Sequence, residues 1–496
     1  MKRVIKKTSF HPIAFATLPV LYLFQRNVVE VTAVTFLFSL LFVIAGTVAA
    51  SHVVEYFFKE KERAAIVTSV FCLIFLVGGS TREYAPKILP PLVLWAIQGG
   101  MSIFLIWVAV RLSKRLKDHQ VAHLTRSLNR IACFLVFFQI AMAGYEKSKL
   151  PPPPSGQSTP ESKAAIINGF QPDVYYIIVD GYASFKALES EYKYSNQPFH
   201  DFLAKAGFYI SENSRANYPE TIVSLPSSLN MQFLHESEVW EPTTDNRDVL
   251  VEMLANNQLI RQFKGMGYKT IQVNSGFYRP TRANPHVDKN FGGLHFDEFS
   301  TTLSMWTLLY PVAEILTREA IRHSNLQALT DLETAAEEKG PKFIFAHLMG
   351  VHGPFVFDRE GKRPNIHGVS WTEKSASSKA RYLNQLVFIT EKLKSTIERI
   401  LRSSKIEPII ILQSDHGPMS YSRVDLTPPS DHRELERAFD SQTRILNAYL
   451  VPPRTREKLY DTVSPVNSFR LLFNSCFGAS FPLLPDKTNY YFGMHR

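Results

Sequence analysis

The stretch "IIILQSDHGP" runs from Ile409 to Pro418 and changes character halfway along its length. Its apolar first half, bounded by turn residues, predicts a strand that is buried on both faces. An acid, a histidine and a glycine follow at once, and Asp and Gly are ordinary turn residues. Asp415 and His416 are also residue types that ligate metals, so the same tripeptide is consistent with either a plain turn or a metal site.

Four other apolar runs have the same texture and also predict buried strands. Amphipathic helical patterns lie between them, most clearly in the segment Ser377–Ser404. Apolar strands that alternate with amphipathic helices predict an α/β domain with a mostly parallel sheet. The four runs are Asp173–Asp180, Tyr268–Val273, Phe343–Met349 and Ile445–Val451.

Polar, metal-competent residues follow three of these predicted strands. Asp180 ends the first strand, His352 follows the strand Phe343–Met349, and Asp415 with His416 follows a late one. In parallel α/β sheets, ligands bind outside the carboxyl ends of the strands. The sequence therefore predicts that these side chains meet at one edge of the sheet and form a metal site.

A candidate nucleophile lies in "ANYPETIVSLPSSLN" (Ala216–Asn230), which offers several hydroxyl groups. Thr221 stands where a loop turns into an apolar helical stretch, and a helix N-terminus favours an anion. The alternative for Thr221 is ordinary helix N-capping. Ser224, one helical turn later, is the rival nucleophile.

Three further histidines are weaker candidates. His347, in "FAHLMG", is either a core histidine on a strand or a residue of the site. His295 and His286 are candidates for lining the pocket.

The N-terminal third contains five apolar stretches and predicts a membrane domain. A bilayer-spanning helix needs ~20 mostly apolar residues, which the second and fourth stretches supply and the other three reach only with flanking residues. A cleavable signal peptide or a soluble core fits poorly, because the apolar segments keep recurring. The five stretches are His11–Phe24, Val31–Ala50, Ala64–Gly79, Leu89–Leu112 and Ile131–Gly144.

Charge is distributed unevenly along the chain, whose net charge is +10. Residues 1–150 hold 18 Lys and Arg against 7 Asp and Glu, and the remainder is nearly balanced, so the basic excess is no sign of nucleic-acid binding. The N-terminal end and the loops after the second and fourth stretches carry 13 basic residues, against 3 in the alternate loops. The positive-inside rule then predicts a cytoplasmic N-terminus and an extracytoplasmic domain after Gly144.

These observations predict three parts. Residues 1–147 form the transmembrane domain, residues 148–168 form a linker, and residues 169–496 form the extracytoplasmic catalytic domain. The linker contains "LPPPPSGQSTPES" (Leu150–Ser162), whose proline run favours an extended, semi-rigid spacer. Cys476 is the single cysteine of the outer domain, so no disulfide forms within it.

The motifs "VDG", "TIVSLPSS", "MGVHGPF" and "SDHG", in this order, resemble those of the alkaline phosphatase/sulfatase superfamily. The resemblance extends to its membrane-bound branch, the phosphoethanolamine transferases and lipoteichoic acid synthases, and covers nearly the whole chain. It implies about five transmembrane helices followed by an outward-facing α/β/α catalytic domain of the alkaline phosphatase type, built on a mostly parallel sheet.

The resemblance also implies roles for individual residues. Thr221 matches the catalytic threonine, and Asp415 with His416 matches the Asp-His ligand pair. Asp180 falls at the acidic ligand position, where the transferases have Glu. His352 matches the histidine that contacts the phosphoryl group, and His432 is a loose counterpart of a further histidine.

The implied cofactor is one divalent ion, Zn²⁺ or Mn²⁺, on Asp180, Thr221, Asp415 and His416. The implied reaction moves a phosphorylated head group from a membrane phospholipid to an envelope glycan or lipid acceptor, through a phospho-threonine. A membrane-tethered hydrolase of the same fold and a non-catalytic envelope binding protein are the alternatives.

Two departures from the family pattern narrow this expectation. Ser227 stands where phosphoethanolamine transferases often have a cysteine. The chain also lacks the C-x-P-x-R or S-x-P-x-R signature of sulfatases, which argues against a sulfate esterase.

Overall fold

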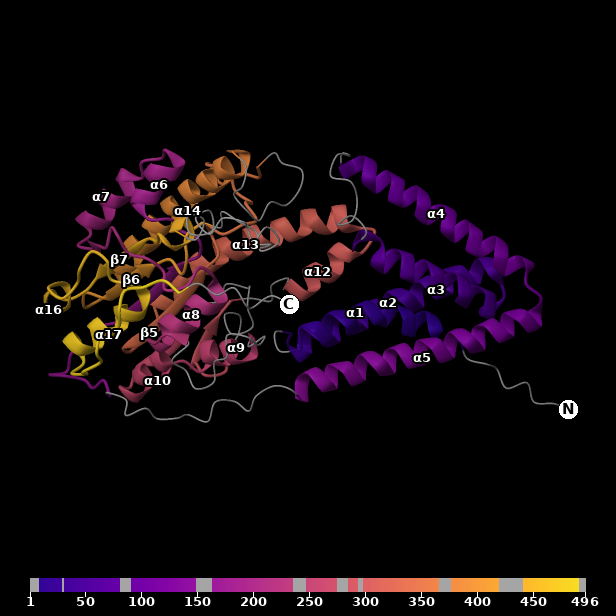
Figure 1. Cartoon of the computed structure of the whole chain (residues 1–496), viewed down its shortest axis with the longest axis horizontal. Helices are drawn as coiled ribbons and strands as arrows, with labels where there is room; N and C mark the ends of the chain where they lie inside the picture. Colours follow the sequence, from indigo (N-terminus) through magenta and orange to yellow (C-terminus); the bar gives the residue numbers. More distant parts are fainter. Residues whose placement is uncertain are drawn as a thin grey trace. The chain divides into compact units, whose positions relative to one another are not determined.

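The computed structural model describes residues 9–28, 31–80, 91–148, 163–234, 247–273, 284–292, 298–364, 376–418 and 440–489. The chain divides into two compact units, which are treated separately below (Figure 1). One unit combines Met1–Leu150 with Phe296–Thr317, and the other combines Pro151–His295 with Arg318–Arg496. The proline-rich linker and the three-part division at residues 147 and 168 stay predictions, since most of the linker lies outside the described residues.

Five apolar helices dominate the first unit, as the sequence predicts. Helices α2 to α5 are long and apolar enough to cross a membrane, and α1 is shorter, with 16 residues. Large apolar side chains on their surfaces, such as Phe42 at 81% exposure, would be unfavourable in water and suit a lipid environment. The helices are α1 (His11–Arg26), α2 (Ala33–Phe58), α3 (Lys61–Val77), α4 (Pro91–Arg115) and α5 (Asp118–Ser148).

The same unit also contains a segment from far along the chain. Helix α12 (Glu298–Trp306) buries Phe299 and Leu303 in an apolar cluster with residues of α1 and α3, among them Val20 and Leu76. Helix α13 (Tyr310–Ala336) begins in this unit and ends in the other. The packing of α12 against the N-terminal helices is not among the predictions from sequence.

A seven-stranded sheet forms the middle of the second unit, in the order β2-β7-β6-β1-β5-β3-β4. Strand β1 is central and pairs in parallel with β5 and β6, while β7 pairs antiparallel with β6 and β2. The strands are β1 (Val174–Val179), β2 (Tyr209–Ile210), β3 (Lys269–Val273), β4 (Lys289–Phe291), β5 (Lys342–Leu348), β6 (Ile409–Gln413) and β7 (Asn447–Leu450).

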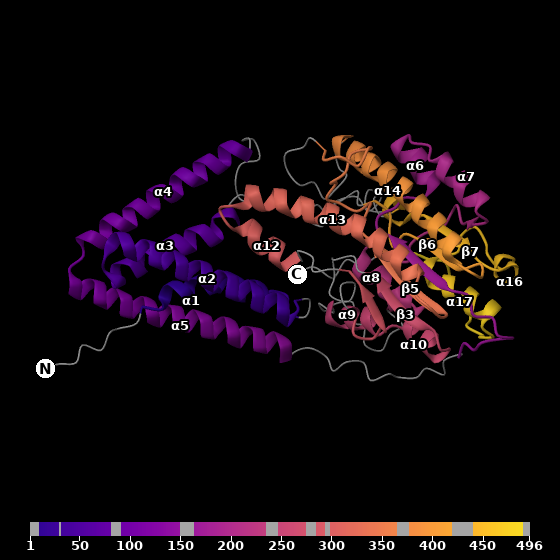
Figure 2. The same cartoon turned by 180° about the vertical axis from the view of Figure 1, so that it is seen from behind.

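Both faces of the sheet are covered by helices, which explains why β1, β5, β6 and β7 are buried along their whole length. Alternate residues of β1 point to opposite faces, so Tyr175 and Ile177 join one core and Tyr176 and Ile178 join the other. Figures 1 and 2 show α14 on one side of the sheet and α10 and α17 on the other. The predicted α/β/α architecture is confirmed.

All five predicted strands are present, and the predicted helix Ser377–Ser404 is α14. Strands β2 and β4 are not among the predicted strands, because they have two and three residues and are too short to carry an alternating pattern. Besides the C-terminal part of α13, the helices of this unit among the described residues are α6 (Phe185–Tyr192), α7 (Gln197–Lys205), α8 (Thr221–Asn230), α9 (Arg247–Ala255), α10 (Gln258–Gly265), α14 (Ala376–Ser403), α16 (Pro453–Arg456) and α17 (Pro465–Cys476).

Candidate active site

Parallel register brings the predicted site residues to one edge of the sheet. Val179 of β1 lies beside Leu348 of β5, and Ile178 lies beside Gln413 of β6, so the three strands end together. Asp180 follows β1 directly, and its backbone N–H donates to the Leu348 carbonyl at 2.9 Å. The residues after β5 and β6 therefore meet those after β1 at the centre of this edge.

Two glycines allow the backbone to turn tightly at these strand ends. Gly181, immediately after Asp180, has φ of +73°, a left-handed conformation that favours glycine. Gly417 follows His416 and lies so close to the next segment that an added Cβ would be 2.6 Å from the Ser441 carbonyl oxygen. Both positions, directly after Asp180 and His416, therefore favour glycine.

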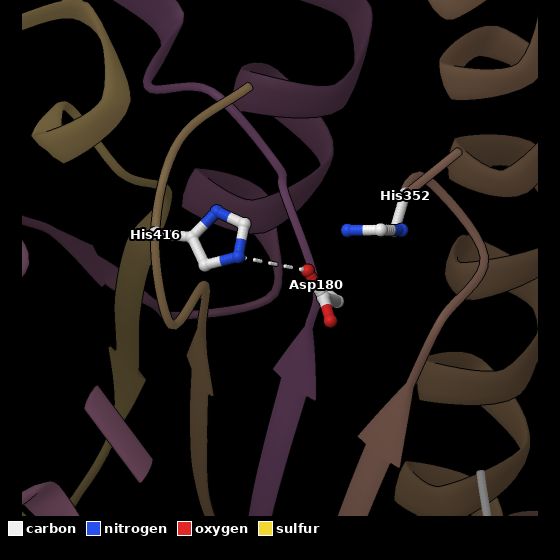
Figure 3. Close-up of side chains that lie close together, drawn as sticks. All are labelled: Asp180, His352 and His416. Atoms are coloured by element: carbon white, nitrogen blue, oxygen red, sulfur yellow. Dashed lines mark ion pairs between the residues drawn. The ribbon is translucent and has the colours of Figure 1, made fainter. Parts of the chain in front are cut away.

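Asp180 lies at the centre of the cluster. Its Oδ2 is 3.1 Å from His347 Nε2 and 3.4 Å from Thr221 Oγ1, and its Oδ1 is 3.4 Å from His416 Nε2. Figure 3 shows the rings of His416 and His352 on opposite sides of this carboxylate. His347 is fully buried and belongs to the cluster around Asp180, although it lies on a strand.

Asp415 supplies a second buried carboxylate, and His416 Nε2 lies 3.6 Å from its Oδ2. Neither of its side-chain oxygens has a hydrogen-bond partner among the described residues, and the same is true of Asp180 Oδ1. A buried carboxylate oxygen without a partner is costly, and a bound cation removes that cost. Ligand atoms of two overlapping groups lie within 4.8 Å of one another: Asp180 with His352 and His416, and Asp180 with His347 and Asp415. The donor set therefore fits a divalent metal ion.

Backbone carbonyls orient two of the imidazoles. Nδ1 of His416 lies 2.6 Å from the Gly417 carbonyl oxygen, and Nδ1 of His352 lies 2.5 Å from that of Gly353. Since a carbonyl can only accept, Nδ1 is the protonated nitrogen in each ring. Nε2 of His416 is left to accept a proton or to ligate a metal, as is usual for metal-binding histidines.

The charged groups of the site perturb one another. Burial would raise the pKa of Asp180, but His352, followed by His347 and His416, holds that pKa well below its usual range. Burial would lower the pKa of His416, yet Asp415 and Asp180 raise it above its ordinary value. Glu220 adds to the same effect on His416. Sequence reasoning missed Glu220, for which adjacency to Thr221 was the available signal.

The hydroxyl groups of Thr221, Ser224 and Ser227 in α8 have different partners. Thr221 is the first residue of α8, while the N-cap is Glu220, which makes no side-chain capping bond. Thr221 Oγ1 instead lies 3.0 Å from His416 Nε2, so the helix-capping alternative does not describe it. Ser224 Oγ donates to the Asp415 carbonyl at 2.7 Å, and Ser227 Oγ donates to the Gln232 carbonyl at 2.6 Å. Both serine hydroxyl groups thus donate hydrogen bonds to backbone carbonyls.

The remaining candidates are not placed in the cluster. His432 and His295 lie outside the described residues. His286 is described, and its Nε2 is 3.9 Å from Glu252 Oε1, apart from the groups around Asp180.

A comparison with known protein families identifies the family of this chain. The profile of the family described as Sulfatase matches residues 172–452, which is more than half of the chain. No curated protein matches the sequence.

The solved structures to which this chain is similar include a periplasmic domain, a transferase and a sulfatase. The C-terminal periplasmic domain of EcEptC from Escherichia coli is 16% identical, with a TM-score of 0.41, over 64% of this chain and 86% of that one. The integral membrane lipooligosaccharide phosphoethanolamine transferase A (EptA) from Neisseria meningitidis is 14% identical, with a TM-score of 0.38, over 94% and 95%. The 2-O GAG sulfatase BT1596 is 11% identical, with a TM-score of 0.40, over 63% of this chain and 72% of that one.

Proposed function

Because this chain belongs to the sulfatase family and is an enzyme of the sulfatase-like kind, we propose that it transfers a phosphorylated head group from a membrane phospholipid to an envelope acceptor. The head group is of the phosphoethanolamine or phosphoglycerol type. The observation that carries the proposal is the hydroxyl of Thr221, held 3.0 Å from His416 Nε2 beside two buried carboxylates.

Asp180, Thr221, Asp415 and His416 would hold the metal. The fit rests on the buried oxygens of Asp415 and Asp180 that accept no hydrogen bond and on Nε2 of His416, which faces both carboxylates. A bound divalent ion, Zn²⁺ or Mn²⁺, supplies positive charge that favours the deprotonated hydroxyl and offsets phosphoryl charge. His347 would position Asp180 through the contact at 3.1 Å.

In the first step, Thr221 Oγ1 attacks the phosphorus of the phospholipid. The new bond joins Oγ1 to phosphorus, and the bond from phosphorus to the glycerol oxygen of the lipid breaks. The proton of the Thr221 hydroxyl passes to Asp180 Oδ2, which lies 3.4 Å from Oγ1, because both ring nitrogens of His416 would be engaged. His352 donates a proton to the departing diacylglycerol oxygen, which leaves the head-group phosphate on Thr221.

In the second step, the hydroxyl group of the acceptor attacks the phospho-threonine. His352, now neutral, takes the proton of that hydroxyl, and Thr221 recovers its own proton as its bond to phosphorus breaks. A sugar or lipid hydroxyl as acceptor makes the protein a transferase, while water as acceptor makes it a hydrolase.

The membrane helices favour the transferase over a sulfatase or a soluble-substrate hydrolase. A single helix would tether a hydrolase, whereas several helices suit a donor that arrives from the bilayer, where tethering raises its effective concentration. The C-x-P-x-R or S-x-P-x-R signature of sulfatases is absent from the sequence, and the proposed nucleophile lies in "TIVSLP" instead. The orientation inferred from loop charge would place this chemistry outside the cytoplasm.

The test uses full-length protein in liposomes with labelled phosphatidylethanolamine or phosphatidylglycerol. The transferase predicts that diacylglycerol accumulates and that the labelled head group passes to an added glycan or lipid acceptor. Release of free head-group phosphate at the same rate with and without acceptor would replace the transferase by a membrane-tethered hydrolase of the same fold.

A further inference from the structure

A segment from the middle of the catalytic sequence is built into the membrane unit. The inner face of α12 carries Phe299, Leu303 and Trp306 at helical spacing, and the first two are buried among apolar residues of the membrane helices. Trp306 packs beside this cluster, and its ring centroid is 6.1 Å from that of Tyr22 in α1. Residues 298–317 thus share a core with helices that occur more than 200 positions earlier in the chain.

Hydrogen bonds fix the end of this segment between two membrane helices. The backbone N–H of Leu308 donates to the Phe75 carbonyl in α3 at 2.8 Å. The Leu308 carbonyl in turn accepts from Trp95 Nε1 in α4 at 3.0 Å. Both backbone groups of one residue are therefore satisfied by membrane helices, which is the requirement for non-helical backbone near a bilayer.

Two glycines at the end of α3 allow the close contact with residues 305–308. A Cβ added to Gly79 would lie 2.5 Å from the Met305 carbonyl oxygen and 2.8 Å from the Trp306 carbonyl carbon. A Cβ on Gly78 would clash with the Leu308 side chain. The absence of side chains at both positions lets two backbones approach closely, as small residues do at helix contacts in membranes.

The chain then exposes an apolar face where α13 begins. Leu309, Val312, Ile315 and Leu316 are between 51% and 60% exposed, and their spacing of three to four residues puts them on one side of the helix. Glu314 is the only residue between Met305 and Thr317 that is charged at neutral pH. A stripe this apolar is unfavourable in water and typical of a helix that lies in the membrane interface.

The position of this apolar stripe beside the membrane helices indicates that lipid covers it. The C-terminal end of α3 and the N-terminal end of α4 are consecutive along the chain, so they lie at the same face of the bilayer. Leu308 is bonded to both, and the stripe follows Leu308 directly. The face is therefore continuous with the lipid-exposed surface of the membrane helices.

We propose that residues 298–316 are an interfacial membrane element, and that Leu309, Val312, Ile315 and Leu316 insert into the acyl-chain region of the bilayer. The element enters at the face opposite the basic loops. This inference requires only that the first unit spans the membrane, and it is independent of the reaction at Thr221.

The test places the photo-crosslinking residue p-benzoyl-phenylalanine, one position at a time, in full-length protein reconstituted into phosphatidylcholine liposomes. The positions are Ile315, Val312, Phe104 of α4 as a lipid-facing reference, and Ile406 as a matched control. Ile406 is 63% exposed and belongs to the other unit. Mass spectrometry then detects lipid adducts after irradiation.

Adducts at Ile315 and Val312 within about threefold of the yield at Phe104, with at least tenfold less at Ile406, are the expected result. Adducts at Phe104 without adducts at either Ile315 or Val312 would overturn the proposal. Equal yields at Ile315 and Ile406 would also overturn it, because labelling would then follow exposure alone. A crosslink from Ile315 to a second copy of the chain, in place of lipid, would assign the face to self-association and reject the lipid.

Discussion

Thr221 Oγ1 lies 3.0 Å from His416 Nε2, although 195 residues separate them along the chain. One comes from the start of α8 and the other from the turn after β6, and Asp180 after β1 contacts both. Three separate elements thus place a hydroxyl group against a carboxylate and an imidazole in a buried setting. This arrangement distinguishes Thr221 from the nearby serines.

Thr221→Ala should reduce turnover at least ~10³-fold, because it removes the only attacking oxygen of the proposed first step. Thr221→Ser keeps an oxygen at nearly the same place and should retain measurable activity. The loss of one hydroxyl contact costs only ~1 kcal/mol in stability, so Tm should change little. The measurement is the rate of diacylglycerol formation in liposomes, together with a thermal scan.

Ser224→Ala is the matched control for the nucleophile. It removes the bond from Ser224 Oγ to the Asp415 carbonyl, which orients a ligand but does not react. Turnover should fall by about tenfold or less. Full activity in Thr221→Ala together with complete loss in Ser224→Ala would show that the nucleophile is the serine.

Asp415→Asn should weaken divalent metal binding by ~10²-fold or more, because it replaces a direct carboxylate ligand. Chelation should lower the Tm of the wild-type protein, since a ligand at 100 times its Kd contributes ~2.7 kcal/mol. The variant should show little Tm change on chelation. Without metal its stability should stay close to that of wild type, because the substitution removes a buried carboxylate that accepts no hydrogen bond but also removes its attraction to His416, whose Nε2 is 3.6 Å from Asp415 Oδ2. A metal-free variant that is clearly less stable would contradict this account of Asp415.

The buried strands and the residues at their carboxyl ends were predictable from sequence. β1, β5 and β6 are mostly apolar and fully buried, and the positions of Asp180, Asp415 and His416 follow from where β1 and β6 stop. That Thr221 faces the cluster and Ser224 does not was not predictable. Both hydroxyls lie on the same helix, and the difference depends on how α8 is rotated against the turn after β6.

Two further features could be identified only from the structure. They are the contact of His347 with Asp180 and the packing of α12 in the membrane unit. His347 lies inside a strand, and only the register that pairs it with Ile178 brings its ring to Asp180. The pattern of Phe299, Leu303 and Trp306 predicts a half-buried helix but carries no information on its partner.

Stability should depend on pH through Glu338, at the opposite edge of the sheet. Lys269, at 2.7 Å, and Lys289 lower the pKa of Glu338 to about 2. A lowered pKa means that the stabilisation is present above the unfolded value of ~4.3 and is lost as the pH falls toward 2. Between pH 6 and pH 3, wild type should lose ~2 °C more in Tm than Glu338→Gln. Parallel pH profiles for the two proteins would contradict this.

Gly79→Ala should destabilise the membrane unit, because its new Cβ meets the backbone at Met305 and Trp306, which cannot move as a side chain can. Overpacking of this kind costs ~1–3 kcal/mol. Gly99→Ala is the matched control, since no atom lies within 4 Å of a Cβ added there. Thermal unfolding in lipid should show a lower Tm for Gly79→Ala only. Equal Tm values for both variants would mean that α12 does not pack against Gly79.

The most direct measurement for the proposed function is covalent labelling of the protein by its donor. Full-length protein in liposomes would be incubated with phosphatidylethanolamine or phosphatidylglycerol labelled in the head group, without acceptor, then quenched and digested for mass spectrometry. The account predicts a head-group phosphate on Thr221 that disappears when an acceptor is added and never forms in Thr221→Ala. A protein that turns over the lipid with no label on Thr221, or that carries equal label in Thr221→Ala, would contradict it.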